Sequence, residues 1–147
     1  MDDAVIREMR EEDIPEILDI EHISFSEPWS EAAFLGEILK SYALNRILLI
    51  GDRLVGYVCV NYLFDEAHIL NLAVHPDFRR RGLATGMMNH ILSELKKRGC
   101  KYIYLEVRVS NTTARAFYER FDFRVAGARK KYYVNPVEDA VLMMRRM

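Results

Sequence analysis

The sequence predicts an α/β fold: a mixed, mostly antiparallel sheet of about seven strands flanked by four helices. The first observation behind this prediction is the order of the segments, β-α-α-β-β-β-α-β-α-β-β, in which short turns join the early strands as in antiparallel hairpins. The second is one strand-helix-strand crossover in the middle, which makes part of the sheet parallel. The third is length, because 147 residues, half of them apolar, suit a single domain over residues 1–147.

Two helices are expected within the first forty residues. Asp13 is the predicted N-cap of the first helix, because Pro15 follows in the first turn and Glu16 stands at the capping-box position. Residues 24–29 interrupt the helical pattern, and Ser30 then caps the second helix. Apolar residues recur at helical spacing in both, which predicts these buried positions: Ile14, Ile17, Leu18, Phe34, Leu35 and Ile38.

Strands are predicted where β-branched and aromatic residues cluster or alternate between turn residues. They cover residues 5–9, 43–50, 54–64, 67–75, 102–109, 123–134 and 140–146. A long helix is expected over residues 81–98, with Gly99 as its stop. A shorter helix begins at Ser110 or Asn111 and ends near Phe121, with aromatic side chains at helical spacing.

The composition excludes several classes of function. The net charge is −1 and no apolar run reaches the ~18 residues of a membrane span. The start of the chain also lacks the pattern of a secretory signal, so we expect a cytoplasmic protein with no membrane partner. Cys59 and Cys100 stand far apart in apolar surroundings, which predicts buried free thiols and no metal site. Nucleic-acid binding is not expected, because aromatic and basic residues do not interleave in one stripe.

Charge is unevenly placed along the chain. Residues 1–40 carry twelve acidic and three basic residues, whereas residues 41–147 carry ten acidic and eighteen basic ones. Solvated helix faces followed by basic loops are the simpler explanation. A cationic substrate on one side and an anionic cofactor on the other is the functional explanation.

The most informative segment is Arg79–Ala84, which reads Arg-x-x-Gly-x-Ala between a predicted strand and the long helix. The first N–H groups of a helix lack partners within it, and the helix dipole adds about half a positive charge there. Gly82 and Ala84 leave room for a pyrophosphate to approach the backbone, and three arginines add positive charge. The spacing matches neither the P-loop nor the Rossmann fingerprint. A solvated, arginine-rich helix start is the alternative.

With residues 69–76, 105–108 and 114–120, this loop resembles the GCN5-related N-acetyltransferases (GNAT), and the resemblance covers nearly the whole chain. It implies the GNAT fold, acetyl-CoA as the acetyl donor and no metal. The strand over residues 72–74 would pair with the pantetheine amides as an added strand does. The residues that the resemblance implies at the cofactor are Leu72, Ala73, Val74, Arg79, Arg80, Arg81, Gly82, Leu83, Ala84, Thr85, Asn111 and Tyr118.

The reaction that the family carries out, attack of an amine on a thioester, needs a proton acceptor and a donor for the departing thiolate. Glu106 is the candidate base, because it lies on the opposite strand face from Leu105 and Val107. A surface carboxylate paired with Arg108 is the alternative. Tyr118 is the candidate acid, and a core aromatic residue is its alternative. The family resemblance favours the catalytic roles.

The histidines are expected to be structural. His68, His75 and His90 have no acidic partner nearby in the sequence. Asn111 suffices as a helix cap even without contact to the cofactor. One residue departs from the family, since Asp122 stands where the family usually has glycine. Aspartate tolerates a left-handed C-cap, so we expect a cost of at most ~1 kcal/mol.

A narrower resemblance, to the bacterial ribosomal-protein-alanine N-acetyltransferases, lies in residues 25–30 and 132–143. The catalytic subunits of archaeal and eukaryotic N-terminal acetyltransferases are similar, but less closely. The resemblance implies transfer to the N-terminal α-amine of a protein, with a ribosomal protein as partner. Acetylation of a lysine or small amine, a non-catalytic acyl-CoA sensor and a nucleotide-binding module are the alternatives. The expected peptide site, which could instead be ordinary packing, comprises Phe25, Pro28, Trp29, Tyr132 and Tyr133.

Overall fold

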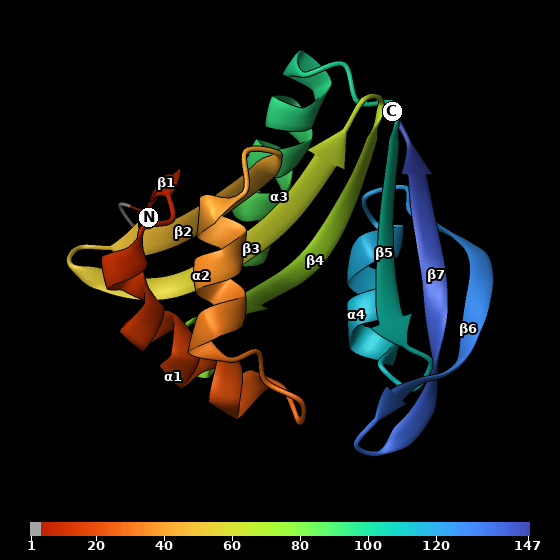
Figure 1. Ribbon diagram of the computed structural model, residues 1–147, viewed down its shortest axis with the longest axis horizontal. Helices are drawn as coiled ribbons and strands as arrows, with labels where there is room; N and C mark the ends of the chain where they lie inside the picture. The colour runs from red at the N-terminus through yellow and green to blue at the C-terminus, as the bar shows by residue number, and fades with distance from the viewer. Residues whose placement is uncertain (1–3) are drawn as a thin grey trace.

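The computed structural model describes residues 4–147, and within them seven strands form one mixed sheet in the order β1-β2-β3-β4-β5-β7-β6 (Figure 1). Every neighbouring pair is antiparallel except β4 and β5, so the predicted mixed sheet is confirmed. The bounds are β1 (Ala4–Glu8), β2 (Ala43–Ile50), β3 (Arg53–Leu63), β4 (Glu66–Val74), β5 (Tyr102–Arg108), β6 (Arg124–Val134) and β7 (Val137–Arg146). The signal-peptide expectation includes residues 1–3, which lie outside the described range.

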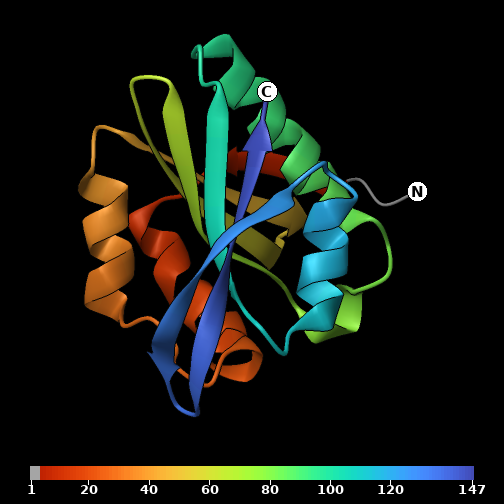
Figure 2. The same ribbon diagram turned by 90° about the vertical axis from the view of Figure 1, so that its right-hand side faces the viewer.

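Two helices cover each face of the sheet (Figures 1 and 2). The helices α1 (Ile14–Ser24) and α2 (Glu31–Leu39) bury their apolar faces against a cluster that contains Ile47, Leu54 and Tyr57. The helices α3 (Leu83–Lys97) and α4 (Thr112–Glu119) pack on the larger cluster of the opposite face. Both cysteines are free and buried, as predicted. No helix within residues 4–147 combines the length and the apolar character that a membrane crossing requires.

The helix ends confirm most of the predicted caps. The Ser30 hydroxyl accepts from the Ala33 N–H at 3.1 Å, and Asn111 Oδ1 accepts from the Ala114 N–H at 3.1 Å. Gly99 follows α3 with φ +79°, the left-handed conformation that favours glycine after a helix. Asp122 also has a positive φ of +65°, the left-handed conformation expected of the residue that stands in place of the family's glycine.

Asp13 is the N-cap residue of α1, as predicted, but the capping bonds expected there are absent. The Asp13 side chain makes no capping bond to α1 and instead binds the Arg7 guanidinium through two bonds of 2.9 Å. Asp13 closes a short 3-10 turn, η1 (Glu11–Asp13), by accepting from the Arg10 N–H at 2.8 Å. The carboxylate of Glu16 accepts from the Leu54 N–H at 3.2 Å, so Glu16 ties α1 to the sheet and forms no capping box. Asp13 and Glu16 thus bind residues outside α1 and do not form the capping bonds that the sequence pattern predicts.

The parallel pair of β4 and β5 positions the site. Residues 66–68 pair with residues 102–104, and beyond His68 the two strands separate (Figure 1). On its other side β4 remains paired with β3 as far as Val74. The edge of β4 over residues 70–74 therefore faces open space where the next strand of a sheet would lie. Because pairing stops while both strands continue, backbone groups there are available to a ligand.

Candidate active site

A cavity of about 260 Å³ lies where β4 and β5 separate. It brings together Glu106 from β5 and Tyr118 from α4, which the sequence assigned to the base and the acid. Leu72 lines the same space from β4, on the side opposite Glu106 in the sheet order. A carboxylate and a phenol from separate elements thus face one small volume, which is the arrangement that proton transfer on both sides of a reacting group needs.

A larger cavity of about 890 Å³ adjoins it on the face covered by α3 and α4. Leu72 and Tyr118 line both spaces, so the two are continuous at these residues. Seven of the expected cofactor residues line this cavity: Leu72, Ala73, Val74, Arg79, Ala84, Asn111 and Tyr118. The Arg79 side chain is held at its edge, because its Nε donates to the Val74 carbonyl at 3.1 Å.

The loop that precedes α3 has the backbone of an anion cradle. Arg80 and Gly82 have positive φ values of +65° and +75°, and Gly82 is the N-cap of the helix. The N–H groups of residues 83–85 precede the first helical bond, from the Gly86 N–H to the Gly82 carbonyl at 3.0 Å. They are therefore the donors that α3 cannot satisfy. Leu83 itself points into the core, so it offers only its backbone.

Replacing Gly82 with valine is expected to weaken acetyl-CoA binding at least tenfold, which corresponds to ~1.4 kcal/mol. A β-branched residue resists a φ of +75°, so the loop would shift its N–H groups away from the cradle. Within residues 4–147, no heavy atom other than those of Gly82 and its two chain neighbours lies within 4 Å of the place that a Cβ would take, so we expect the fold to persist. Isothermal titration calorimetry measures the affinity, and thermal unfolding checks the fold.

Gly51→Val is the matched control for this experiment. Gly51 has a φ of +60° in the β2–β3 turn and equally open surroundings, so the substitution imposes similar strain away from the loop. Its acetyl-CoA affinity should equal that of the wild type. A folded Gly82→Val protein with unchanged affinity would contradict the cradle assignment.

Tyr118 is half-buried on α4, with its ring against Phe117 and Phe123 at centroid distances of 5.2 and 5.7 Å. Burial raises the pKa of its hydroxyl well above the usual value. The phenol therefore keeps its proton at neutral pH and can donate a hydrogen bond within the cavity. The ring contacts fix the orientation of the side chain, which a donor to a single atom requires.

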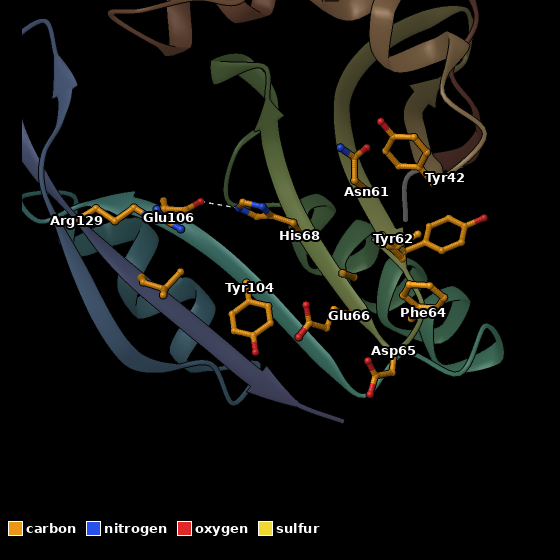
Figure 3. A pocket seen from close by; sticks show the side chains of 13 residues that line it. Tyr42, Asn61, Tyr62, Phe64, Asp65, Glu66, His68, Tyr104, Glu106 and Arg129 are labelled. Carbon is orange, nitrogen blue, oxygen red and sulfur yellow. Dashed lines mark hydrogen bonds and ion pairs between the residues drawn. The ribbon is translucent and has the colours of Figure 1, made fainter.

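Glu106 has two partners that the sequence did not indicate. Its Oε1 lies 2.5 Å from His68 Nε2, and its Oε2 accepts from Arg129 Nε at 3.1 Å (Figure 3). The Glu106 side chain is only 7% exposed, whereas those of His68 and Arg129 are 39% and 54% exposed. His68 therefore has an acidic partner, although none was identified near it in the sequence. The partner is 38 residues away in sequence, on the neighbouring strand, and the β4–β5 register brings the two together.

Arg108 is not the partner of Glu106. Its Nη2 binds Glu27 at 2.8 Å, its Nη1 binds Glu138 at 3.2 Å, and its guanidinium lies 4.4 Å from the centroid of the Tyr133 ring. The alternative of a surface carboxylate paired with Arg108 is therefore wrong. Burial raises the pKa of Tyr133 to about 12, and the ring lines the cavity together with Glu106.

Arg108 and Glu27 belong to a bridge between the segment that follows α1 and the β6–β7 turn, which lie side by side in Figure 2. Glu27 accepts from the N–H groups of Val134 and Asn135 at 3.1 and 3.0 Å. The Ser26 hydroxyl donates to the Asn135 carbonyl at 2.6 Å. The two backbone N–H groups lower the pKa of Glu27, so the bridge keeps its charge at neutral pH.

Glu21 is a carboxylate of the site that the sequence analysis did not identify. It is 1% exposed on α1 and accepts from the Tyr57 hydroxyl at 2.6 Å and from Asn71 Nδ2 at 2.8 Å. Its other oxygen accepts from the Trp29 N–H at 2.9 Å. A buried carboxylate is stable only when it is bound in this way. Glu21 therefore fixes the segment between α1 and α2 to the sheet beside the cavity.

The expected peptide residues do not all reach the cavity. Phe25, Trp29 and Tyr133 line it, and the Trp29 ring also packs on Phe34 at 5.1 Å. Tyr132 is 49% exposed and makes edge contact with Tyr133, but it lies outside the cavity lining, as does Pro28. Of the cofactor residues expected in the loop before α3 and in its first turn, these do not line the larger cavity: Arg80, Arg81, Gly82, Leu83 and Thr85.

Comparison with known proteins identifies the family to which this chain belongs. The profile of the acetyltransferase (GNAT) family matches residues 7–123. A [ribosomal protein bS18]-alanine N-acetyltransferase from Salmonella typhimurium is 40% identical over 133 residues, which span 89% of each chain. The crystal structure of the ribosomal-protein-S18-alanine N-acetyltransferase from Escherichia coli matches with a TM-score of 0.90 and 34% identity. That match covers 97% of this chain and 93% of the other.

The structure of Ard1 from Thermoplasma volcanium also matches with a TM-score of 0.90, at 28% identity over 98% of this chain and 97% of the other. The family profile spans the strand β4, the loop at residues 79–84, and the elements that carry Glu106 and Tyr118. All the residues that line the cavity between β4 and β5, except Tyr133, thus lie within the matched region. This chain belongs to the GNAT family of acetyltransferases.

Proposed function

We propose that this acetyltransferase moves the acetyl group of acetyl-CoA to the N-terminal α-amine of a ribosomal protein. Its Salmonella and Escherichia relatives are named [ribosomal protein bS18]-alanine N-acetyltransferases. The observation that supports the proposal is the cavity between β4 and β5, which Glu106 and Tyr118 share. It joins a second cavity that is suited to the donor. Ribosomal proteins are made in the cytoplasm, so the proposal includes a cytoplasmic location.

The residues present fit acetyl-CoA on one face of the sheet. The N–H groups of the first turn of α3, with the open space at Gly82, suit a pyrophosphate. The unpaired edge of β4 over residues 72–74 suits amide groups, which would bind as an added strand does. When bound, acetyl-CoA supplies the thioester carbonyl that the amine attacks.

Glu106 and Tyr118 of the smaller cavity, together with His68 beside Glu106, supply the proton transfers. Glu106 and His68 form a hydrogen-bonded pair at the end of the paired region, and His68 is the more exposed partner. We assign to this pair the removal of the amine proton, directly or through a water molecule, with release toward solvent on the His68 side. An imidazole can accept a proton at one ring nitrogen while it donates one from the other, so it suits this relay. Tyr118 donates to the departing sulfur.

The proposed base suits an α-amine better than a lysine. An α-amine has a pKa of about 8 and a lysine amine about 10.4, so at pH 7 about a tenth of the former is neutral but well under a thousandth of the latter. A carboxylate–imidazole pair therefore has to remove a proton from a smaller fraction of the substrate when the substrate is an α-amine. Phe25, Trp29 and Tyr133 enclose the cavity and favour a small first residue, alanine or serine.

Mass spectrometry of two matched peptides tests the proposal. One has a free N-terminal alanine and no lysine; the other has a blocked N-terminus and one internal lysine in the same flanking sequence. With acetyl-CoA, the first should be acetylated at least tenfold faster at pH 7. Faster acetylation of the lysine peptide would contradict the proposed α-amine substrate and leave the family assignment intact.

A further inference from the structure

Ser24 is a half-buried residue whose hydroxyl group makes no hydrogen bond. It is the last residue of α1, and its Oγ is covered from solvent and has no partner within residues 4–147. A serine within a helix commonly binds its hydroxyl to the carbonyl group four residues earlier, and Ser24 does not. Covered hydroxyl groups without a hydrogen bond are uncommon in folded proteins, so this one calls for an explanation.

Ser24 lines the larger cavity, which is the one suited to acetyl-CoA. The loop before α3 marks one end of that cavity, where Arg79 lies. Phe25, Leu72 and Tyr118 line both cavities and therefore mark the other end, where the two spaces join. Ser24 directly precedes Phe25 in the chain, so it belongs to the end at which the thioester of a donor held by the loop would react.

The last turn of α1 is tied to the sheet, which fixes the backbone of Ser24. Glu21, one turn earlier, accepts from Asn71 Nδ2 on β4 at 2.8 Å and from the Trp29 N–H at 2.9 Å. The Phe25 N–H donates to the Glu21 carbonyl at 3.1 Å, which closes the helix. The Ser24 hydroxyl itself is held by no bond, so rotation about Cα–Cβ to another staggered position turns it toward the cavity without movement of the backbone.

One requirement of the reaction has no side chain assigned to it so far. Attack on a thioester moves negative charge onto the carbonyl oxygen, and hydrogen-bond donors aimed at that oxygen accelerate such reactions. Glu106 and His68 are assigned to the amine proton and Tyr118 to the departing sulfur. Ser24 carries a further hydroxyl at this end of the cavity, and a hydroxyl is a donor.

From these observations we propose that the Ser24 hydroxyl donates a hydrogen bond to the carbonyl oxygen of the thioester and is a further catalytic residue. As the amine nitrogen bonds to the carbonyl carbon, the π electron pair of the C=O bond moves to the oxygen that Ser24 contacts. When that pair returns, the C–S bond breaks and Tyr118 gives its proton to the sulfur. The amine proton goes to Glu106 and His68, and Ser24 keeps its own proton throughout.

This inference goes beyond the proposed function, because it holds whichever amine accepts the acetyl group. It concerns the donor, so it is tested on the enzyme without a peptide. Its failure would leave the proposed α-amine substrate unaffected, and acetylation of a lysine in place of an α-amine would leave Ser24 with the same role.

A pair of ligands that differ in the carbonyl group tests the proposal by calorimetry. S-ethyl-CoA has a methylene group where acetyl-CoA has the carbonyl group. Ser24→Ala is expected to weaken binding of acetyl-CoA by about fivefold, the effect of one ordinary hydrogen bond. Its affinity for S-ethyl-CoA should equal that of the wild type, because this ligand offers no oxygen to the hydroxyl.

Infrared spectroscopy gives a second measurement that a purely structural role of Ser24 would not affect. With acetyl-CoA labelled with ¹³C at the carbonyl carbon, the C=O stretching band should lie at lower frequency in the wild-type complex than in solution. Ser24→Ala should move the band back toward the solution frequency. With a peptide substrate present, kcat should fall by about tenfold or more.

Ser93→Ala is the matched control. It removes a hydroxyl from an exposed position of α3 that lines neither cavity, so affinities and band should match the wild type. Equal loss of affinity for both ligands in Ser24→Ala would overturn the proposal, since the hydroxyl would then act on another part of the donor or on the fold. Unchanged affinity for acetyl-CoA, or a wild-type band at the solution frequency, would overturn it as well.

Discussion

Replacing Tyr118 with phenylalanine is expected to lower kcat by about 10²-fold or more, which lies within the usual range for general acid catalysis. The substitution removes one hydroxyl from the cavity and keeps the ring contacts with Phe117 and Phe123. Acetyl-CoA affinity should change little. Steady-state kinetics with a peptide that has a free N-terminal alanine measures kcat, and calorimetry measures the affinity.

Tyr133→Phe is the control for this substitution, because Tyr133 lines the same cavity. As a residue expected at the peptide, Tyr133 should affect the peptide KM more than kcat. The pH dependence adds a further check. The pKa of Tyr118 is raised, so its proton stays bound and ionisation of Tyr118 should cause no loss of wild-type rate between pH 7 and 9. A Tyr118→Phe enzyme with normal kcat would reduce Tyr118 to a packing residue.

Glu106→Gln is expected to lower kcat at pH 7 by about 10²-fold or more, with partial recovery as the pH rises. Recovery follows because solvent deprotonates the amine, whose neutral fraction grows about tenfold per pH unit below its pKa of about 8. His68→Gln should change the pH profile in the same direction but by less, since Glu106 remains in the cavity. Rates measured from pH 6 to pH 9 would show both effects.

Arg129→Gln distinguishes loss of the base from loss of an ion pair. Arg129 binds the second oxygen of Glu106 but carries no proton acceptor, so its removal should change kcat by less than about threefold. If His68→Gln leaves the pH profile unchanged, His68 takes no part in proton removal. An equally large loss in Arg129→Gln would show that the ion pairs of Glu106, and not its basicity, matter for the rate.

Strong local patterns explain why most of the fold could be predicted. The strand β2 was predicted at its observed bounds, and the predicted bounds of α3 differ from the observed ones by two residues at the start and one at the end. Ser30, Gly99 and Asn111 mark ends through bonds or dihedral angles within a few residues. Asp13 has the sequence pattern of a capping residue, but its side chain binds Arg7 on β1, a contact that no pattern within the helix predicts.

In the candidate site, too, local patterns could be predicted from the sequence and tertiary contacts could not. Glu106 and Tyr118 were found from strand alternation, helical spacing and a family resemblance, and the structure places both in one cavity. The contact of His68 with Glu106 could not be predicted, because it depends on the parallel register of strands separated by a whole helix. That register also determines how Asp65 and Glu66 lie relative to Glu106, so their arrangement is a product of the tertiary fold.

The short pairing of β4 with β5 has a thermodynamic consequence. In the sheet, the part made of β1–β4 meets the part made of β5–β7 through three residue pairs. A ligand that contacts both parts binds only the folded chain, and at a hundred times its dissociation constant it adds about 2.7 kcal/mol to the free energy of unfolding. For a chain of about this length, each kcal/mol raises the midpoint of thermal unfolding by about 2–4 °C. Resistance of this protein to heat therefore depends on the supply of the small molecule that joins its two half-sheets.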